Sequence, residues 1–185
     1  MGTIIAAEVA SQAPDMIIGV ALIDGSRISK EDPTEAVAKS NERFEHMGFK
    51  RCIKAKFERM FLPSSDERVK KHIIDRACAQ PEVNSIKIIS SAVRWCAEDF
   101  ECKYSQLRVP IQVLQSTNRA EGMERAPVTA DSYIKWHHDL MACGVDAEFE
   151  LVEDCGHFTM LDRPDVVNTT INRLLQRVDM SSANQ

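Results

Sequence analysis

Three short segments of the chain have the hydrophobic pattern of buried β-strands. The first, residues 16–23 (MIIGVALI), is almost continuously apolar, as strands covered on both faces of a parallel sheet are. The second is residues 109–115 (VPIQVLQ) and the third is residues 148–152, with a helix predicted between them at residues 131–143. Strand, helix and strand at this spacing predict parallel βαβ connections, so an α/β fold is expected.

Helical periodicity occupies both ends of the chain. Residues 1–13 predict an alanine-rich helix that is apolar around nearly its whole circumference and therefore needs protein on several sides. Pro164 opens a last predicted helix, residues 164–178, which has a single apolar face. These helices are expected to cover the sheet.

The stretch between the first two strands has a helical pattern throughout. Its methionine and aromatic positions fit packing between helices better than a binding box. We expect helices at residues 36–49, 52–61, 67–78 and 82–100. The predicted organisation is a core helix and strand at residues 1–32, a helical insertion at 33–104, core strands and helices at 105–180, and a disordered tail at 181–185.

Composition argues against nucleic-acid binding and membrane insertion. With 185 residues, 44% of them hydrophobic, the chain is long enough for one domain with a real core. The formal net charge is −5 and no block of lysine and arginine occurs, so nucleic acid is not an expected partner. No apolar run approaches the ~20 residues of a membrane span, and the first residues lack the pattern of a secretory signal.

The cysteines and histidines do not have metal-site spacing. Six cysteines are scattered without CxxC pairs, so we expect reduced, mostly buried thiols and a cytoplasmic protein. His137 and His138 are adjacent, and neighbours in a helix point in different directions. No metal and no cofactor is predicted.

Two residues are the first candidates for chemistry. His157 follows a predicted strand and a turn cluster, residues 153–156, and precedes the helix that starts at Pro164, so it is free to point into a cleft. Asp24 lies at the carboxyl end of a buried strand, where open α/β sheets place groups that contact ligands. The alternatives are a loop histidine bonded to a carbonyl and an aspartate that caps the following segment.

Three stretches resemble the carboxyl-terminal half of an α/β-hydrolase with a lid. They are IIGVALIDGSR at residues 17–27, VPIQVLQS at 109–116 and GHFTMLDRPDVVNTTINRLL at 156–175. The resemblance implies a partial parallel sheet made of the last three strands of that fold, with the helical insertion as the lid. It also implies that His157, in a Gly-His turn before the final helix, is the general base.

The resemblance leaves two positions for the triad carboxylate. Some members of the family carry it at the end of the sixth strand, where Asp24 stands, and others in the loop after the seventh strand. That loop reads STNRAEGMER here and offers only Glu121 and Glu124. We favour Asp24, with Glu121 as the alternative acid.

The nucleophile of the family lies in a G-x-S-x-G turn between a strand and a helix, and the chain has no such motif. Met1-Gly2-Thr3 looks like the residues that follow the serine in an elbow of the form G-x-S-M-G. The chain is therefore expected to be a truncated product, the product of an alternative start or a fragmentary gene model that begins just after its nucleophile, with the Met1 backbone as an oxyanion donor. Ser11, Ser26 and Ser116 lack the elbow context and are expected to be ordinary hydroxyls.

Two functional readings follow. The first is a cofactor-independent hydrolase of an ester or similar small apolar substrate in a complete relative, with little or no activity in this chain alone. The second is a non-catalytic fragment that binds a small molecule or a partner chain. In that case a partner, or a second copy, is expected to cover the exposed edge of the strand at residues 16–23.

Overall fold

The sheet of the protein is parallel and is covered by helices on both faces. The computed structural model describes residues 1–119 and 125–183, without the side chains of 181–183. Strands β1 (Val20–Ile23), β2 (Ile111–Gln115) and β5 (Ala147–Leu151) pair in the order β1-β2-β5, with β2 in the middle. Both pairings are parallel, which confirms the predicted fold class of a partial parallel α/β sheet.

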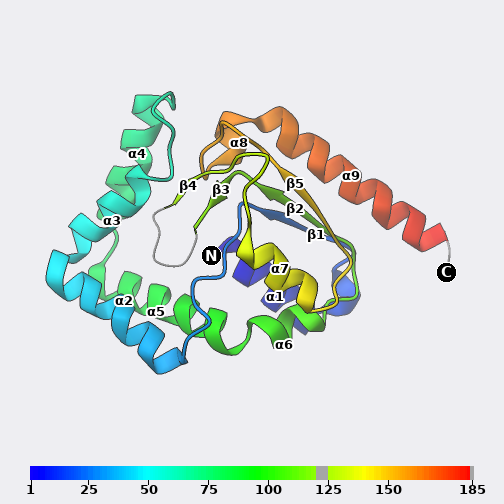
Figure 1. Cartoon of the computed structure of the whole chain (residues 1–185), viewed down its shortest axis with the longest axis horizontal. Helices are drawn as coiled ribbons and strands as arrows, with labels where there is room; N and C mark the ends of the chain where they lie inside the picture. Colours follow the sequence, from blue (N-terminus) through cyan, green and yellow to red (C-terminus); the bar gives the residue numbers. More distant parts are fainter. Residues whose placement is uncertain (120–124, 184–185) are drawn as a thin grey trace.

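One face of the sheet packs on α9 (Pro164–Ala183) and the other on α1 (Gly2–Gln12), α6 (Phe100–Ser105) and α7 (Lys135–Ala142) (Figure 1). Alternate residues of the strands serve the two sides. Leu22 and Val113 belong to the cluster that contains residues of α1, α6 and α7, whereas Leu114 packs with Val167 of α9. Gly19 lets α9 approach, since a Cβ there would lie 3.0 Å from the Val178 side chain.

A block of helices lies beside the carboxyl ends of the strands, at the left of Figure 1. Within it α2 packs on α5 and α3 on α4. Asp32 and Asp66 cap two of these helices with side-chain bonds to backbone N–H groups, and Gly48, with φ of 78°, separates α2 from α3. The helices are α2 (Pro33–Met47), α3 (Phe49–Glu58), α4 (Glu67–Cys78) and α5 (Glu82–Glu98).

Several predicted boundaries were wrong. The first strand covers only Val20–Ile23, because Pro14–Met16 form a short 3-10 helix, η1, before it. The helix predicted at 131–143 begins at Lys135, because Ser132 closes a turn with the backbone of Thr129. The last helix extends past residue 178 to Ala183.

The polar loop predicted after β2 contains a small antiparallel ribbon of β3 (Thr117–Asn118) and β4 (Ala126–Pro127), which the sequence pattern did not indicate. A short helix, α8 (Thr159–Asp162), lies between His157 and α9. Within the described ranges, no helix is both long enough and apolar enough to cross a membrane.

Candidate active site

Asp24 is held in the interior at the tip of β1. Its backbone N–H continues the sheet by donating to the Leu114 carbonyl at 2.7 Å, and its φ of 49° then turns the chain out of the strand. This left-handed conformation is one that aspartate adopts more readily than most residues. The Asp24 side chain is fully buried as a result.

Four groups besides histidine donate to the buried Asp24 carboxylate. The backbone N–H groups of Ser116 and Thr117 donate to Oδ1 at 3.0 and 2.6 Å. The Thr117 hydroxyl and the Arg125 guanidinium donate to Oδ2 at 2.6 and 2.8 Å. Burial by itself would raise the pKa of Asp24, but the His157 hydrogen bond, the Arg125 charge and the Thr117 hydroxyl outweigh it and lower that pKa. Asp24 is therefore a carboxylate in the folded protein at neutral pH.

His157 bonds directly to this carboxylate, with Nδ1 at 2.5 Å from Asp24 Oδ2. A carboxylate only accepts hydrogen bonds, so Nδ1 carries the hydrogen and a neutral ring presents the lone pair of Nε2. No other hydrogen bond to the ring is formed within residues 1–119 and 125–183. The side chain is 27% exposed, so part of the ring is open to solvent.

The turn that carries His157 is pinned to the helical block. The His157 N–H donates to the Met60 carbonyl at 2.8 Å, and the rings of Phe61 and Phe158 lie 4.8 Å apart. At Gly156 only a hydrogen fits, because a Cβ would lie 2.6 Å from the Met60 oxygen. Asp162 accepts from the Gly156 N–H at 2.8 Å, so it stabilises the turn.

The start of α1 lies beside the tip of β1. A Cβ on Gly25 would lie 3.1 Å from the Thr3 methyl and 2.6 Å from the Trp136 ring, so glycine is needed for this close approach. Burial, with the nearby charges of Lys56 and Arg125, lowers the pKa of the Met1 amine. The first turn of α1 is thus brought to the side of the molecule where Arg125 binds Asp24.

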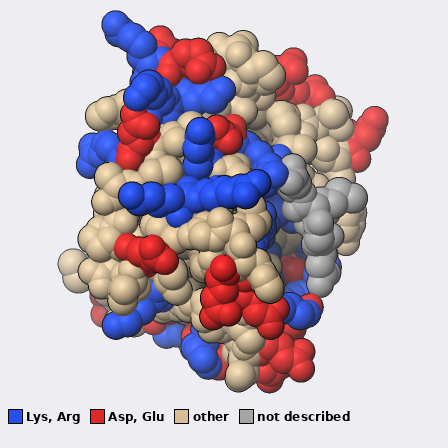
Figure 2. All heavy atoms as spheres, turned by 90° about the vertical axis from the view of Figure 1, so that its left-hand side faces the viewer, with Lys and Arg blue, Asp and Glu red and all other residues tan. Residues whose placement is uncertain are grey.

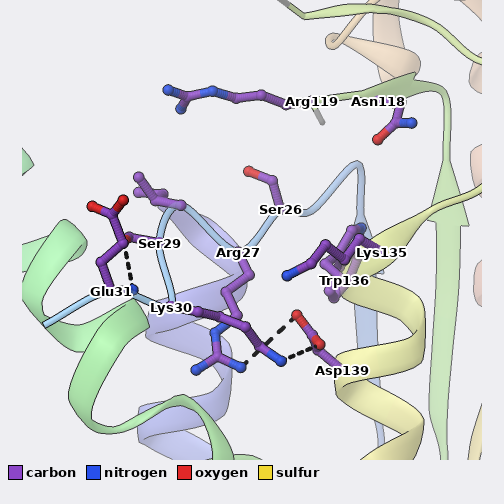
Figure 3. Close-up of a pocket in the computed structure, with 11 residues that line it drawn as sticks. Ser26, Arg27, Ser29, Lys30, Glu31, Asn118, Arg119, Lys135, Trp136 and Asp139 are labelled. Carbon is purple, nitrogen blue, oxygen red and sulfur yellow. Dashed lines mark hydrogen bonds and ion pairs between the residues drawn. The ribbon is translucent and has the colours of Figure 1, made fainter. Parts of the chain in front are cut away.

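A small cavity of about 160 Å³ lies against residues 26–31, and we call it the Asp139 pocket. Two of its cations, Arg27 and Lys30, are compensated by an acid, since both reach Asp139 (Figure 3). Lys30 lies 2.5 Å from Asp139, and Arg27 also binds Glu101 at 2.6 Å while its guanidinium lies 4.5 Å from the Phe100 ring centre. This arrangement fixes the segment after Asp24 in place.

A larger cavity of about 320 Å³ lies between the helical block and the ribbon, and we call it the cationic cavity. Apolar residues form half of its described wall. The charged wall residues are all cations: Arg43 of α2, Lys56 of α3, Arg59, Arg119 and Arg125. In the space-filling view of this side of the molecule, Lys and Arg side chains gather in a band across the face (Figure 2).

The cations of this cavity affect one another. Lys56 is an exposed residue, yet desolvation of its ammonium group among neighbouring atoms and the charges of Arg119, Arg125 and Arg43 lower the pKa of Lys56 to about 8. Arg125, which is 12% exposed, forms the link between the cavity wall and Asp24. Arg125 therefore connects the wall of the cationic cavity to the Asp24–His157 pair.

Solved structures with the same fold were found for nearly the whole chain. They include the enol-lactonase from Burkholderia xenovorans LB400 (TM-score 0.66, 19% identity, covering 95% of this chain and 63% of that one). A hydrolase from Pseudomonas aeruginosa PA01 (0.64, 14%, 93% and 60%) and a thermophilic esterase from Thermogutta terrifontis (0.60, 19%, 96% and 62%) are also similar. The chain has an α/β-hydrolase fold.

The match covers only part of that α/β-hydrolase fold. The chain spans less than two thirds of the length of each of these three structures. Neither a protein-family model nor a curated protein matches the chain. At these identities the α/β-hydrolase likeness describes the arrangement of the backbone, and the chemistry has to be argued from the side chains.

Within the α/β-hydrolase frame, the residues named from the sequence fall into four groups. Asp24 and His157 are brought into contact. Ser11 and Ser116 are engaged in structure, since Ser11 donates to the Glu8 carbonyl at 2.9 Å and the fully buried Ser116 to the Gly156 carbonyl at 2.7 Å. Ser26 lines the Asp139 pocket. Glu121 and Glu124 lie outside the described residues.

Sequence reasoning missed Arg125 and Thr117. Both lie in the polar loop after β2, and no local pattern shows that the loop folds back over the tip of β1. The α/β-hydrolase fold brings them there, and they supply two of the donors to Asp24. Within residues 1–119 and 125–183, no group of three His, Cys, Asp or Glu side chains is arranged to hold a metal ion.

Proposed function

We propose that this chain is hydrolase-like, with His157 as general base and Asp24 as the carboxylate that orients it, for an ester or similar small substrate. The observation that carries the proposal is the 2.5 Å contact between His157 Nδ1 and the buried Asp24 Oδ2. An aspartate in this position fixes the tautomer of the imidazole and stabilises its charged form. The esterase and lactonase neighbours support the same reaction class.

The proposed chemistry begins at Nε2. There the imidazole takes the proton of an attacking hydroxyl, and the positive charge that forms on the ring is balanced by Asp24, itself held by Arg125 and Thr117. The proton then passes from Nε2 to the leaving alkoxide. Glu121 remains the alternative acid, and it lies outside the described residues.

The hydroxyl is the part that residues 1–185 do not supply in a G-x-S-x-G elbow. We therefore propose that this chain alone has little or no serine-dependent hydrolase activity. The Met1 backbone as an oxyanion donor is part of the same proposal, supported by the position of α1 beside the tip of β1.

The test is turnover of p-nitrophenyl butyrate, together with labelling by a fluorophosphonate that reacts with activated serines. The proposal predicts a rate indistinguishable from that of the His157→Gln variant, and no labelled serine. Turnover that is lost in Ser26→Ala, with label on Ser26, would contradict it, because the pocket serine would then be the nucleophile.

We further propose that the helical block acts as the lid, residues 33–104. The support is the direct contact of Met60 and Phe61 with the histidine turn. A lid in contact with the base would exclude water from the reacting groups.

The alternative is a non-catalytic protein that binds a small molecule or a partner chain. Along the described chain β1 pairs only with β2, and Met16 and Ile18 before it are 81% and 66% exposed. Exposed apolar residues beside a free strand edge favour pairing with another chain or a second copy. Sedimentation velocity of the wild type and Ile18→Lys separates the readings: a dimer lost in the variant supports the alternative.

We also propose a cytoplasmic location on the basis of the thiols. All six cysteines are free, and Cys52, Cys96 and Cys155 are buried. Free buried thiols are typical of reducing compartments. Labelling of native and denatured protein with a thiol reagent, without reductant, is expected to count six free thiols after denaturation.

A further inference from the structure

The wall of the cationic cavity consists of cationic side chains and apolar side chains. Arg43, Lys56 and Arg119 approach it from α2, from α3 and from the end of the ribbon strand β3. Between them the wall is apolar, with Phe44, Ile53 and further side chains from α5, and none of the described wall residues is acidic. The full apolar set is Ile28, Phe44, Cys52, Ile53, Ile89 and Val93.

Cations that face a common space repel one another unless an anion lies among them. Burial of the Lys56 ammonium group and, after it, the charges of Arg119, Arg125 and Arg43 lower the pKa of Lys56, in line with that repulsion. An oxyanion in the cavity would accept hydrogen bonds from the guanidinium and ammonium groups and remove the repulsion. Guanidinium and ammonium donors to an oxyanion form the stronger class of hydrogen bonds in proteins.

The size and the apolar half of the cavity limit the ligand further. A volume of about 320 Å³ is at the lower end of ligand pockets, which span roughly 300–1,000 Å³. Phe44, Ile53 and Val93 would contact a short hydrocarbon body, whereas a purely inorganic anion would leave them without a partner. The wall therefore fits a small molecule with one apolar and one anionic end.

The position of the cavity connects it to the candidate chemistry. Arg125 lines the cavity and donates to Asp24 at 2.8 Å, and Asp24 binds His157. Only Arg125 would thus separate an anionic ligand in the cavity from Asp24, the carboxylate that orients the base.

We propose that the cationic cavity binds the oxyanion end of a small amphiphilic substrate, a carboxylate or a phosphate monoester with a hydrocarbon body of a few carbons, held by Arg43, Lys56 and Arg119. The word substrate rests on the hydrolase function proposed above, whereas the binding itself does not. The two oxyanion chemistries share the same donors, and the experiment distinguishes them.

The test is calorimetric titration of the full chain with four probes: hexanoate, hexyl phosphate, the neutral hexanamide and inorganic phosphate. We expect at least one of hexanoate and hexyl phosphate to bind about tenfold or more tightly than both hexanamide and inorganic phosphate, because charge and hydrocarbon both contribute. The tighter of the two anions identifies the oxyanion. Equal affinity for hexanamide, or no binding of either amphiphile, overturns the proposal.

Charge-removing variants locate the site. Arg43→Gln and Lys56→Gln are each expected to weaken binding of the preferred anion about tenfold, since each removes one charged donor. Lys54→Gln is the matched control, because Lys54 lies on the same helix α3, is exposed and is absent from the cavity wall. A Lys54→Gln variant that weakens binding as much as Lys56→Gln would show non-specific attraction and overturn the proposal.

The two proposals fail separately. Titration needs no turnover, so a chain that hydrolyses nothing still tests the cavity. Conversely, absence of anion binding leaves the contact between Asp24 and His157, and the chemistry proposed for it, unaffected. Thermal unfolding of each variant confirms that a lost affinity is not a lost fold.

Discussion

The two charged cavities share Ile28 and Arg119 in their walls but differ in how their cations are compensated. In the Asp139 pocket, Arg27 and Lys30 are bound by acids of α6 and α7, through Glu101 and Asp139. In the cationic cavity, Arg125 is bound by Asp24, and the other described charges of the wall are again positive.

This difference distinguishes cations that stabilise the fold from cations that are placed to bind a ligand. Cations that are matched by acids of the same fold fix a segment in place, and here they hold residues 26–31 behind Asp24. Arg43, Lys56 and Arg119 face a space where no described wall residue is acidic, so they repel one another, and a bound anion would relieve that repulsion. Substitutions that change one charge at a time in each cavity test this difference.

The largest expected effect is the loss of folding stability when the acid that binds an arginine is removed. Asp24→Asn leaves Arg125 buried without a carboxylate, so we expect a loss of about 3 kcal/mol in the free energy of unfolding. Glu101→Gln removes the 57% exposed partner of Arg27 but leaves Arg27 with Asp139 at 3.8 Å, so it should lose less, about 1 kcal/mol. Urea unfolding measures both, and equal losses would contradict the assignment of Asp24 as the central buried charge.

Acid pH should act through the same residue. The pKa of folded Asp24 lies below its usual value of about 3.9, so Asp24 contributes stability above that value, and the contribution disappears as the pH falls through the folded pKa. We expect the wild type to lose stability below about pH 4 and Asp24→Asn to lose less over the same range. Parallel curves for the two proteins would show that Asp24 does not titrate abnormally.

A smaller effect is expected in the pH dependence of anion binding. Lys56 has a pKa of about 8 beside Arg43, Arg59, Arg119, Arg125 and the Met1 amine, so its positive charge is lost as the pH rises from 7 to 9. Affinity for hexanoate or hexyl phosphate, whichever binds, should fall by several fold over this range. Titrations of Lys56→Gln should show a weaker dependence, and an identical slope would assign the effect to another group.

The smallest expected effect is on thermal stability, where substitutions of two lysines should act in opposite directions. The lowered pKa of Lys56 means that its charged form is disfavoured in the folded protein, so Lys56→Gln should raise the melting temperature at pH 7. Lys30→Gln removes the 2.5 Å partner of Asp139 and should lower stability by up to about 1 kcal/mol. Scanning calorimetry of the two variants gives both signs, and two shifts in the same direction would remove the distinction between the cavities.

The sequence predicted well what depends on local pattern. The apolar runs predicted the parallel sheet, and the Gly-His turn before Pro164 predicted where the histidine lies relative to the last helix. Asp24 at the end of a buried strand was identified because strand ends in parallel sheets meet at one edge. Boundaries were less accurate where a turn, such as the one closed by Ser132, competes with a helix start.

The donors to Asp24 and the cationic cavity could not be predicted in this way. Arg125 and Thr117 reach Asp24 across more than 90 residues of sequence, through a loop without a strand pattern. Arg43 and Lys56 lie on the polar faces of ordinary amphipathic helices, where a cation usually faces water. Only the packing of α2 and α3 against the ribbon turns those faces toward a common space.

The central claim is that Asp24 holds the imidazole of His157 with the hydrogen on Nδ1 and the lone pair on Nε2. Nitrogen-15 NMR of the histidine rings in the neutral form tests it directly, with His157→Gln to assign the resonances and Asp24→Asn as the comparison. The account predicts the Nδ1–H tautomer in the wild type and a mixture of tautomers in Asp24→Asn. An Nε2–H tautomer in the wild type, or a His157 spectrum unchanged by Asp24→Asn, would contradict it.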